Sequence, residues 1–386
     1  MTVSLVIASV AFGTWAYLMA AHGGFWRASV RDDRAEPAEP ATWPAVVAVI
    51  PARDEADNIA EALTSLLSQD YSGSFRIVLV DDQSRDGTAV IAWRTATDME
   101  NQRLTILSGR RLPPGWTGKV WAMKQGIDWV NDLSDAPEYL LLTDADIAYS
   151  SRSLRRLVAR AAADNLVLTS LMVKLRCDSW AERAFVPAFV FFFQMLYPFG
   201  WVKRPDRATA AAAGGCMLVR RDALSKAGGI ETIRHALIDD CALGKRLKAI
   251  GPIWLGLTDA VRSLRPYPHL GDIRHMVSRS AYAQLRFSPL LLAGTVAGMM
   301  LTYLAAPFLA AFATGPARAM GALTWLMMAV AFQPTLRLYG RSPVWGVALP
   351  AIATAYVAFT VDSAYQHLRG RGGLWKGRVQ AHGMPQ

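Results

Sequence analysis

Between residues 46 and 175 the chain repeats one pattern: a short apolar run, a polar turn, and a stretch with helical periodicity. Short apolar runs bounded by turn residues are typical of buried strands. Strands that alternate with helices over short links predict a doubly wound α/β sheet with mostly parallel strands and flanking helices. The expected strands are 46–50, 76–80, 104–107, 139–143 and 166–175, and the expected helices are 58–67, a helix after Thr88, 120–130 and 151–163.

Three of these strands end in polar, mostly acidic clusters. In such sheets ligands bind at the carboxyl ends of the strands. Alternate residues of an extended chain face the same side, so Asp144 and Asp146 can both point toward one cation. Their oxygens suit Mg²⁺ or Mn²⁺ held together with phosphate oxygens. The clusters are Arg53-Asp54-Glu55, Asp81-Asp82 and Asp144-Ala145-Asp146.

Each cluster also has a simpler explanation. Asp-x-Asp alone is more often a polar turn, and Asp54 and Glu55 could cap the next helix. Asp81 and Asp82 are harder to explain, because adjacent carboxylates repel unless a positive or hydrogen-bond-donating group meets them. A nucleoside offers such donors in its ribose hydroxyls and base N–H groups. Three clusters at one expected edge therefore indicate a site.

Uncharged stretches at both ends predict membrane helices. Residues 2–21 are long enough to cross a bilayer, so 1–22 is expected to be an uncleaved N-terminal anchor, followed by a Pro-rich linker at 23–43. Beyond Ser288, spans are expected at about 289–313, 319–336 and 344–362. Residues 288–365 would then hold two or three C-terminal transmembrane helices, and 366–386 a basic tail.

Basic residues predict the orientation. Arg27, Arg31 and Arg34 follow the first span closely, which places residues 44–287 in the cytoplasm by the positive-inside rule. Three C-terminal spans would put the basic tail outside, against the same rule. Either one hydrophobic stretch is re-entrant, or the rule does not hold here.

Two further stretches fit a membrane surface. The segment at 185–202 is apolar but interrupted by Pro187, Gln194 and Pro198, and is interpreted as an interfacial helix. A buried core helix is nearly as good an interpretation. A basic amphipathic helix is expected from about 271 to 287, facing either lipid or phosphate.

Composition agrees with this picture. The chain of 386 residues is 52% hydrophobic and 19% charged, with a net charge of +10, which fits an anionic membrane surface or an anionic substrate. Its motifs do not support nucleic-acid binding. The three cysteines, Cys177, Cys216 and Cys241, are widely spaced and fit a reducing compartment.

The second half of the expected sheet domain adds two candidate features. Residues 213–220 are expected to form a further strand led by Gly214 and Gly215, where missing side chains would let another group approach the backbone. Asp239 and Asp240 open an expected helix that ends near Ile250. Either aspartate could simply be a cap. Beside the first acidic site, one of them could instead be a general base that removes a hydroxyl proton.

Taken together, these motifs resemble the family 2 glycosyltransferases with a GT-A fold, over about residues 44–285. Within that family the chain looks most like the membrane-bound, hopene-associated glycosyltransferases of hopanoid biosynthesis. The motifs in order are Pro51-Ala-Arg-Asp-Glu55, Val80-Asp-Asp-Gln-Ser84-x-Asp86-Gly-Thr88, Lys119-x5-Gln125-Gly126, Asp144-Ala-Asp146, Gly214-Gly215 and Asp239-Asp240.

The resemblance implies a GT-A, Rossmann-like sheet and inverting transfer from a nucleotide-diphosphate sugar, with UDP as the favoured nucleotide and Mg²⁺ or Mn²⁺ as the metal. It assigns the metal to Asp146 and catalysis to Asp240 as base, with Asp239 where the family usually has Glu. Gly214 and Gly215 would lie on the acceptor side. The implied donor-binding residues are Ala52, Arg53, Glu55, Asp82, Lys119, Asp144 and Arg279.

The resemblance also implies a lipid hydroxyl as acceptor, a hopanoid among the candidates, and a multi-pass protein of the bacterial inner membrane with its catalytic domain in the cytoplasm. Processive relatives carry Gln-x-x-Arg-Trp after the base. Here only Arg279 matches, with Met276 and Ser280 at the Gln and Trp positions. This departure favours the addition of one sugar or a few to a lipid over polysaccharide synthesis.

Other functions remain open on the sequence alone. They include another membrane lipid or polysaccharide glycosyltransferase and a nucleotidyltransferase, although the latter would need a Gly-rich phosphate loop after the first strand. A membrane scaffold or transporter component that binds nucleotide without turnover is a different class. Charged residues inside the expected spans would favour a transporter, and the expected spans hold almost none.

Overall fold

Eight strands form one mixed sheet in the order β3-β2-β1-β4-β7-β6-β8-β5. The first four are parallel, as the sequence predicts, and so are β6 and β8. However, β7 runs antiparallel to β4 and β6, and β5 antiparallel to β8. The strands are β1 (Val46–Ala52), β2 (Phe75–Asp81), β3 (Leu104–Ser108), β4 (Tyr139–Leu142), β5 (Ile147–Tyr149), β6 (Leu168–Lys174), β7 (Met217–Arg220) and β8 (Ile253–Ser263).

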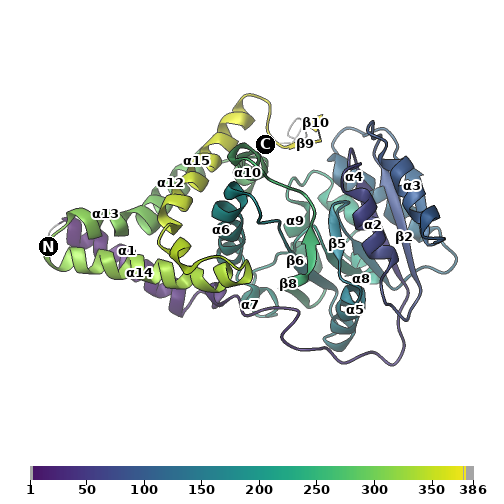
Figure 1. The fold of residues 1–386 in the computed structure, drawn as a ribbon, viewed down its shortest axis with the longest axis horizontal. Coiled ribbons are helices and arrows are strands. Elements are labelled where there is room, and N and C mark those ends of the chain that lie inside the picture. The colour runs from purple at the N-terminus through teal and green to yellow at the C-terminus, as the bar shows by residue number, and fades with distance from the viewer. Residues whose placement is uncertain (1–2, 377, 380–386) are drawn as a thin grey trace. The chain divides into compact units, whose positions relative to one another are not determined.

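This computed structural model describes residues 3–376 and 378–379, so the end of the expected basic tail lies outside the described residues. Two units are distinguished (Figure 1). The sheet unit comprises Val30–Arg176, Trp201–Pro266 and Leu374–Gln386, and the helical unit comprises Met1–Ser29, Cys177–Gly200 and Tyr267–Gly373.

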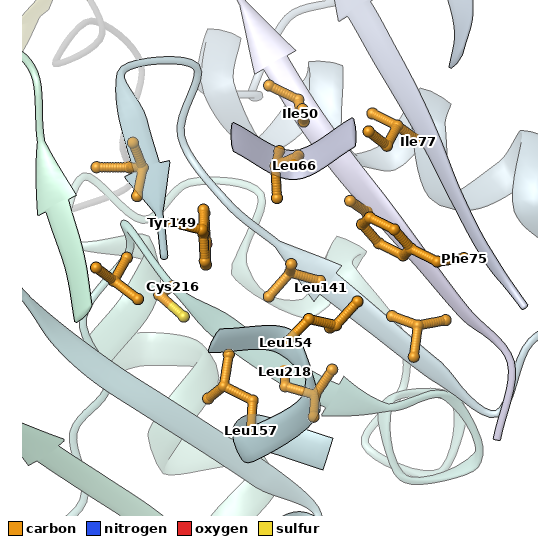
Figure 2. Packing of buried hydrophobic residues seen from close by; sticks show 14 of the residues in the cluster. Ile50, Leu66, Phe75, Ile77, Leu141, Tyr149, Leu154, Leu157, Cys216 and Leu218 are labelled. Carbon is orange, nitrogen blue, oxygen red and sulfur yellow. The ribbon is translucent and has the colours of Figure 1, made fainter. Parts of the chain in front are cut away.

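One face of the sheet is covered by α2 (Ile59–Leu67), α3 (Thr88–Asp98) and α5 (Ser153–Ala163). Their apolar side chains meet those of β1, β2, β4 and β7 in a continuous core (Figure 2). Burying apolar surface of this kind is the main stabilising contribution to such a fold. Labelled members of this core are Ile50, Leu66, Phe75, Ile77, Leu141, Tyr149, Leu154, Leu157, Cys216 and Leu218.

Helix α4 (Gly118–Asn131) packs on β1 and β2, and Gly126 explains how closely it approaches them. A Cβ at Gly126 would lie 2.5 Å from Cγ1 of Val49 and 3.2 Å from Cγ2 of Val80. Only glycine fits such a contact without movement of the strands. The motif position therefore has a packing role, and it places the start of α4, with Lys119, at the carboxyl edge of the sheet.

Two strands, β5 and β8, are not among those predicted. Strand β5 has only three residues, and β8 covers a region for which the sequence pattern predicted no element. The last expected strand begins late, because β7 starts at Met217 and leaves Gly214 and Gly215 in the preceding loop. Helix α9 (Asp239–Lys248) agrees with the expected helix, and α8 (Arg221–Lys226) and η2 (Ile230–Ile233) connect β7 to it.

The helical unit has an aromatic core. Trp15 of α1 (Val3–Ala20) donates a hydrogen bond from Nε1 to the carbonyl of Thr302 at 2.8 Å and meets the ring of Tyr303 edge-on. Phe191 and Phe192 lie on α6 (Trp180–Leu196), and Phe192 packs against Tyr303. The remaining elements of this unit are η1 (Phe25–Arg27), α10 (Leu270–Ser278), α11 (Ala281–Gln284), α12 (Pro289–Met299), the π-helical η3 (Met300–Leu304), α13 (Ala305–Phe312), α14 (Gly315–Leu338), η4 (Pro343–Gly346) and α15 (Leu349–Leu368).

Among the described residues, four helices are long and apolar enough to cross a membrane: Val3–Ala20, Trp180–Val202, Pro289–Phe312 and Gly315–Leu338. Three correspond to expected spans, and α15, at the position of the expected span 344–362, is not among them. The segment interpreted as interfacial is α6 followed by the short α7 (Phe199–Val202), and 61% of its apolar window is buried. That burial favours the alternative of a helix buried against its neighbours.

The basic helix expected at 271–287 is two helices. Helix α10 ends at Ser278 and α11 begins at Ala281, so the chain breaks around Arg279 and Ser280. At the end of α10, the hydroxyl oxygen of Ser278 lies 2.8 Å from Oδ2 of Asp362 and 3.1 Å from the carbonyl oxygen of Phe359, both on α15. The single amphipathic helix was therefore a wrong prediction.

Candidate functional site

The loop after β1 is held by the turn that precedes α3. The backbone N–H of Glu55 donates to Oγ1 of Thr88 at 2.9 Å, and that of Ala56 donates to Oδ2 of Asp86 at 2.8 Å. Asp54 has a φ of 50°, a left-handed conformation that Asp adopts more readily than most residues. Contacts from Asp86 and Thr88 thus hold the backbone of the loop after β1 in its observed shape.

The base of this loop is lined by Arg53 and Asp82. Asp82 is completely buried, and its backbone N–H donates to the carbonyl of Ala52 at 2.7 Å. The guanidinium of Arg53 donates to the carbonyl of Asp82 and lies 3.8 Å from Oδ2 of that residue. Ala52, Arg53 and Asp82 are therefore brought together at one edge of the sheet, as the sequence predicts for neighbouring parallel strands.

Lys119 links the first Asp of the Asp-x-Asp pair to the acidic pair of α9. Its Nζ lies 2.8 Å from Oδ1 of Asp144 and 3.1 Å from Oδ2 of Asp239. Burial alone would lower the pKa of Lys119, but the carboxylates of Asp144, Asp239 and Asp240 outweigh it and raise that pKa. The ammonium group is therefore charged at any working pH and neutralises part of the surrounding negative charge.

Asp240 lies beside Lys119 and Gly214. Its Oδ2 accepts a hydrogen bond from the N–H of Gly214 at 2.9 Å, and its Oδ1 accepts one from the N–H of Cys241 at 2.7 Å. Burial, and then the charge of Asp239, raises the pKa of Asp240 to about 6. A carboxylate with such a pKa is ionised at neutral pH and is a stronger base than an ordinary aspartate.

Only one of the two glycines faces this cluster. A Cβ at Gly214 would lie 3.0 Å from Nζ of Lys119 and 3.4 Å from Oδ2 of Asp240. Gly215 instead packs against Val173 and Ile147, where a Cβ would come within 3.0 Å and 3.2 Å of their side chains. The structure gives Gly215 a packing role and Gly214 a place in the site.

Asp146 is paired with a cation that sequence reasoning missed. Nε of Arg265 donates to Oδ2 of Asp146 at 2.8 Å, and its Nη2 donates to Oε1 of Glu55 at 2.6 Å. Arg265 lies just past the end of β8, and Leu264 donates its N–H to the carbonyl of Asp146 at 2.8 Å. Because β8 was not predicted, nothing in the sequence pattern placed Arg265 at this edge.

A second missed cation, Lys376, comes from the C-terminal segment of the sheet unit. Its Nζ lies 2.9 Å from Oε1 of Glu55 and donates to the carbonyl of Asp54 at 2.8 Å. Burial raises the pKa of Glu55, while the charges of Arg265 and Lys376 oppose that rise. The segment carries β9 (Leu374–Trp375) and β10 (Arg378–Val379), which pair with each other.

The carboxylate oxygens of the site suit a divalent cation only if a bound phosphate supplies further oxygens. Asp144 and Asp146 supply hard carboxylate oxygens, the type that Mg²⁺ and Mn²⁺ prefer. Within 3–376 and 378–379, however, no three His, Cys, Asp or Glu side chains are grouped to hold a metal. Asp146 fits a metal that it shares with phosphate oxygens, since Mg²⁺ commonly binds proteins in this way.

One expected donor-binding residue lies elsewhere. Arg279 follows α10 in the helical unit, so its role remains a prediction. The other expected residues of the site (Ala52, Arg53, Glu55, Asp82, Lys119, Asp144, Asp146, Gly214, Asp239 and Asp240) belong to the sheet unit.

Comparison with known proteins gives a family match over part of the chain. Residues 47–228 match the model of the family described as Glycosyl transferase family 2. The matched stretch contains the loop after β1, Asp82, Lys119 and the Asp144–Asp146 pair. It ends before Asp240, Arg265 and Lys376.

One curated relative is an N-acetylglucosaminyltransferase from Rhizobium leguminosarum bv. viciae. It is 37% identical over 144 residues, which are 36% of this chain and 31% of the relative. The chain thus spans about a third of that relative's length.

One solved structure shares the fold of this chain. The mannosyltransferase PcManGT from Pyrobaculum calidifontis, solved with GDP-Man and Mn²⁺, has a TM-score of 0.53 at 19% identity, over 93% of this chain and 99% of that one. The glucosyl-3-phosphoglycerate synthase from Mycobacterium tuberculosis, solved with Mn²⁺, UDP-glucose and phosphoglyceric acid, has a TM-score of 0.39 at 19% identity, over 63% and 79% of the two chains. The first likeness supports the GT-A-like architecture of the sheet.

Proposed function

We propose that this protein is an inverting glycosyltransferase that moves a sugar from a UDP-linked nucleotide-diphosphate sugar to a lipid hydroxyl, and the match of residues 47–228 to the Glycosyl transferase family 2 model supports this. The observation that carries the proposal is the position of Asp240. Its carboxylate accepts a hydrogen bond from the N–H of Gly214, and the Cα of Gly214 also faces Lys119, which pairs with Asp144. A proton acceptor thereby lies next to the residues proposed to hold the donor.

The reaction is a single displacement. The acceptor hydroxyl oxygen forms a bond to the anomeric carbon while the bond from that carbon to the diphosphate oxygen breaks. The electron pair leaves with the nucleoside diphosphate, and the hydroxyl proton passes to Asp240. Attack opposite the leaving group inverts the anomeric configuration. General base catalysis of this type contributes about 10²–10⁴-fold to a rate.

The chain's own residues would bind and orient the donor. Arg53 and Asp82 border the nucleoside pocket, and Lys119 holds Asp144 beside the sugar. A divalent metal, when bound at Asp146 together with the phosphates, would supply Lewis-acid stabilisation of the leaving charge. Asp239 keeps Lys119 oriented and raises the basicity of its neighbour Asp240.

A lipid acceptor is supported by the apolar helices. Four of them in the described part of the chain are long enough to cross a bilayer, which is difficult to explain for a transferase with a soluble acceptor. A polycyclic lipid alcohol, such as a hopanoid, is the acceptor to test first, and the cytoplasmic face of a bacterial inner membrane is the proposed location. UDP-N-acetylglucosamine is the first donor to test, because the curated relative is an N-acetylglucosaminyltransferase.

The test is nucleotide release by the full chain in detergent or liposomes. The proposal predicts release of UDP from a UDP-sugar only when Mg²⁺ or Mn²⁺ and a polycyclic lipid alcohol are both present. Release that depends on a soluble acceptor instead would contradict the lipid assignment. A wild-type protein that binds no nucleotide-sugar with metal present would contradict the transferase assignment itself.

A further inference from the structure

Two cations share one carboxylate oxygen in the donor region. Oε1 of Glu55 lies 2.6 Å from Nη2 of Arg265 and 2.9 Å from Nζ of Lys376. Glu55 is buried, with 7% of its surface exposed, so little water screens this arrangement. Arg265 also pairs with a second carboxylate, Asp146, at 2.8 Å, so two cations and two carboxylates lie together at this edge of the sheet.

The proposed function, on which this step rests, brings a diphosphate to the neighbouring Asp146. We propose that Arg265 and Lys376 are diphosphate-binding residues of the donor site, which Glu55 holds in place until a nucleoside diphosphate enters. Arginine binds phosphate and carboxylate oxygens alike, through short, charge-assisted and often bidentate hydrogen bonds. The planar fork of Arg265 can move from two carboxylates to two phosphate oxygens without losing a charge-assisted bond.

The two residues differ in how they are supported. Arg265 follows directly on β8 and is anchored by the bond from Leu264 to Asp146, so it remains at the sheet edge in any state. Lys376 lies on the C-terminal segment, where its carbonyl also accepts from Nε of Arg53 at 3.4 Å. Donor binding through Lys376 would therefore bring this residue and the adjoining β9 close to the bound diphosphate.

The discriminating comparison is between UDP and UMP, which differ by one phosphate. Binding of both is measured with the purified full chain by calorimetry, in EDTA and again with Mg²⁺, and GDP and GMP serve as a parallel pair. The measurement in EDTA isolates the contribution of the protein's cations from that of a metal. UMP binding also reports whether each variant is folded.

Arg265→Ala should weaken UDP binding by about 10- to 100-fold and change UMP binding by less than about threefold, because charge-assisted bonds to phosphate are lost. Arg265→Lys should give an intermediate loss, since it keeps the charge but not the fork. Lys376→Ala should weaken UDP binding by about five- to tenfold, again without a matching effect on UMP.

Matched controls lie nearby. Arg262→Ala is the control for Arg265. The Arg262 side chain lies near the end of β8, is 64% exposed and pairs with Glu61 at 2.8 Å. Lys226→Ala removes an equally exposed lysine paired with Asp222. Neither should change the UDP-to-UMP ratio by more than about twofold.

Several outcomes would overturn the proposal. If Arg265→Ala weakens UDP and UMP equally, or neither, Arg265 does not bind the diphosphate. Tighter UDP binding by Lys376→Ala would mean that the C-terminal segment blocks the site. Failure of the wild type to bind either nucleotide pair counts against the donor class in the proposed function, whereas normal turnover with an unchanged UDP-to-UMP ratio in the variants counts against this inference alone.

Discussion

The Nζ atom of Lys119 lies 2.8 Å from Oδ1 of Asp144. The same ammonium group lies 3.1 Å from Oδ2 of Asp239, at the start of α9, which begins more than a hundred residues after Lys119. One lysine thereby connects the Asp-x-Asp pair to the helix that carries the proposed base. Its removal should therefore change both the activity and the titration of that base.

Replacing Lys119 with alanine should reduce kcat/KM by about 10²-fold, because Asp144, Asp239 and Asp240 would lose their shared counter-charge. The acid limb of the pH–rate profile should also move above its wild-type position near pH 6, since the remaining carboxylates repel. Lys124→Ala is the control, as Lys124 lies on the same helix but pairs with Asp128 and Glu231. An unchanged pH profile for Lys119→Ala would mean that Lys119 does not act on Asp240.

The wild-type pH profile provides a second test. Asp240 accepts a proton only when ionised, and burial raises its pKa to about 6. Therefore kcat/KM should be constant from about pH 7 upward and fall about tenfold per pH unit below 6. UDP binding measured over the same range separates this effect from protonation of the donor. A limb at about pH 4, the range of an ordinary aspartate, would contradict the assigned environment.

Gly126→Ala should destabilise the sheet unit by about 1–3 kcal/mol through overpacking, since the new Cβ would meet Val49 at 2.5 Å. Thermal unfolding of the full chain measures the effect as a lowered Tm. Gly271→Ala on α10 is the matched control, because a Cβ added there would have no neighbouring atom within 4 Å. Equal melting temperatures for the two variants would show that α4 can move away from β1 at little cost.

Asp146→Ala should abolish the stimulation of turnover by Mg²⁺ or Mn²⁺, because the carboxylate proposed to share the metal with the phosphates is removed. Titration of Mn²⁺ in the presence of UDP, followed by paramagnetic resonance, measures metal binding independently of turnover. Asp222→Ala, at an exposed ion pair, should bind Mn²⁺ as the wild type does. If Asp146→Ala still binds Mn²⁺ as the wild type does, the metal is held by residues other than Asp146.

Much of the parallel half of the sheet could be predicted from sequence, and the reason is local. Strands β1, β2, β3 and β4 are short apolar runs bounded by turns, and β1, β2 and β4 are each followed by a polar residue at the same edge. Parallel neighbours connected through helices bring those ends together. The positions of Arg53, Asp82 and Asp144 at this edge could therefore be predicted from the pattern alone, while their roles stay predictions.

The other half of the sheet depends on long-range pairing that a local pattern does not contain. Strand β5 is only three residues long and pairs with β8, more than a hundred residues away. Strand β8 is continuous, but Gly256 and the exposed Asp259 interrupt its run of apolar residues. Its sequence therefore lacks the pattern from which the other strands were predicted. Arg265 was missed with it, since its partners Asp146 and Glu55 lie 119 and 210 residues away.

The central claim is that Asp240 takes the acceptor's proton, and substitution with asparagine tests it most directly. Asp240→Asn keeps the shape and one oxygen that can accept from the N–H of Gly214, but it removes the negative charge and the second accepting oxygen. Turnover and donor affinity are measured on the same preparation, with Asp222→Asn as control. We expect UDP-sugar binding within about threefold of wild type and turnover reduced by about 10²–10⁴-fold. Turnover at the wild-type rate would contradict the assignment of Asp240 as the base.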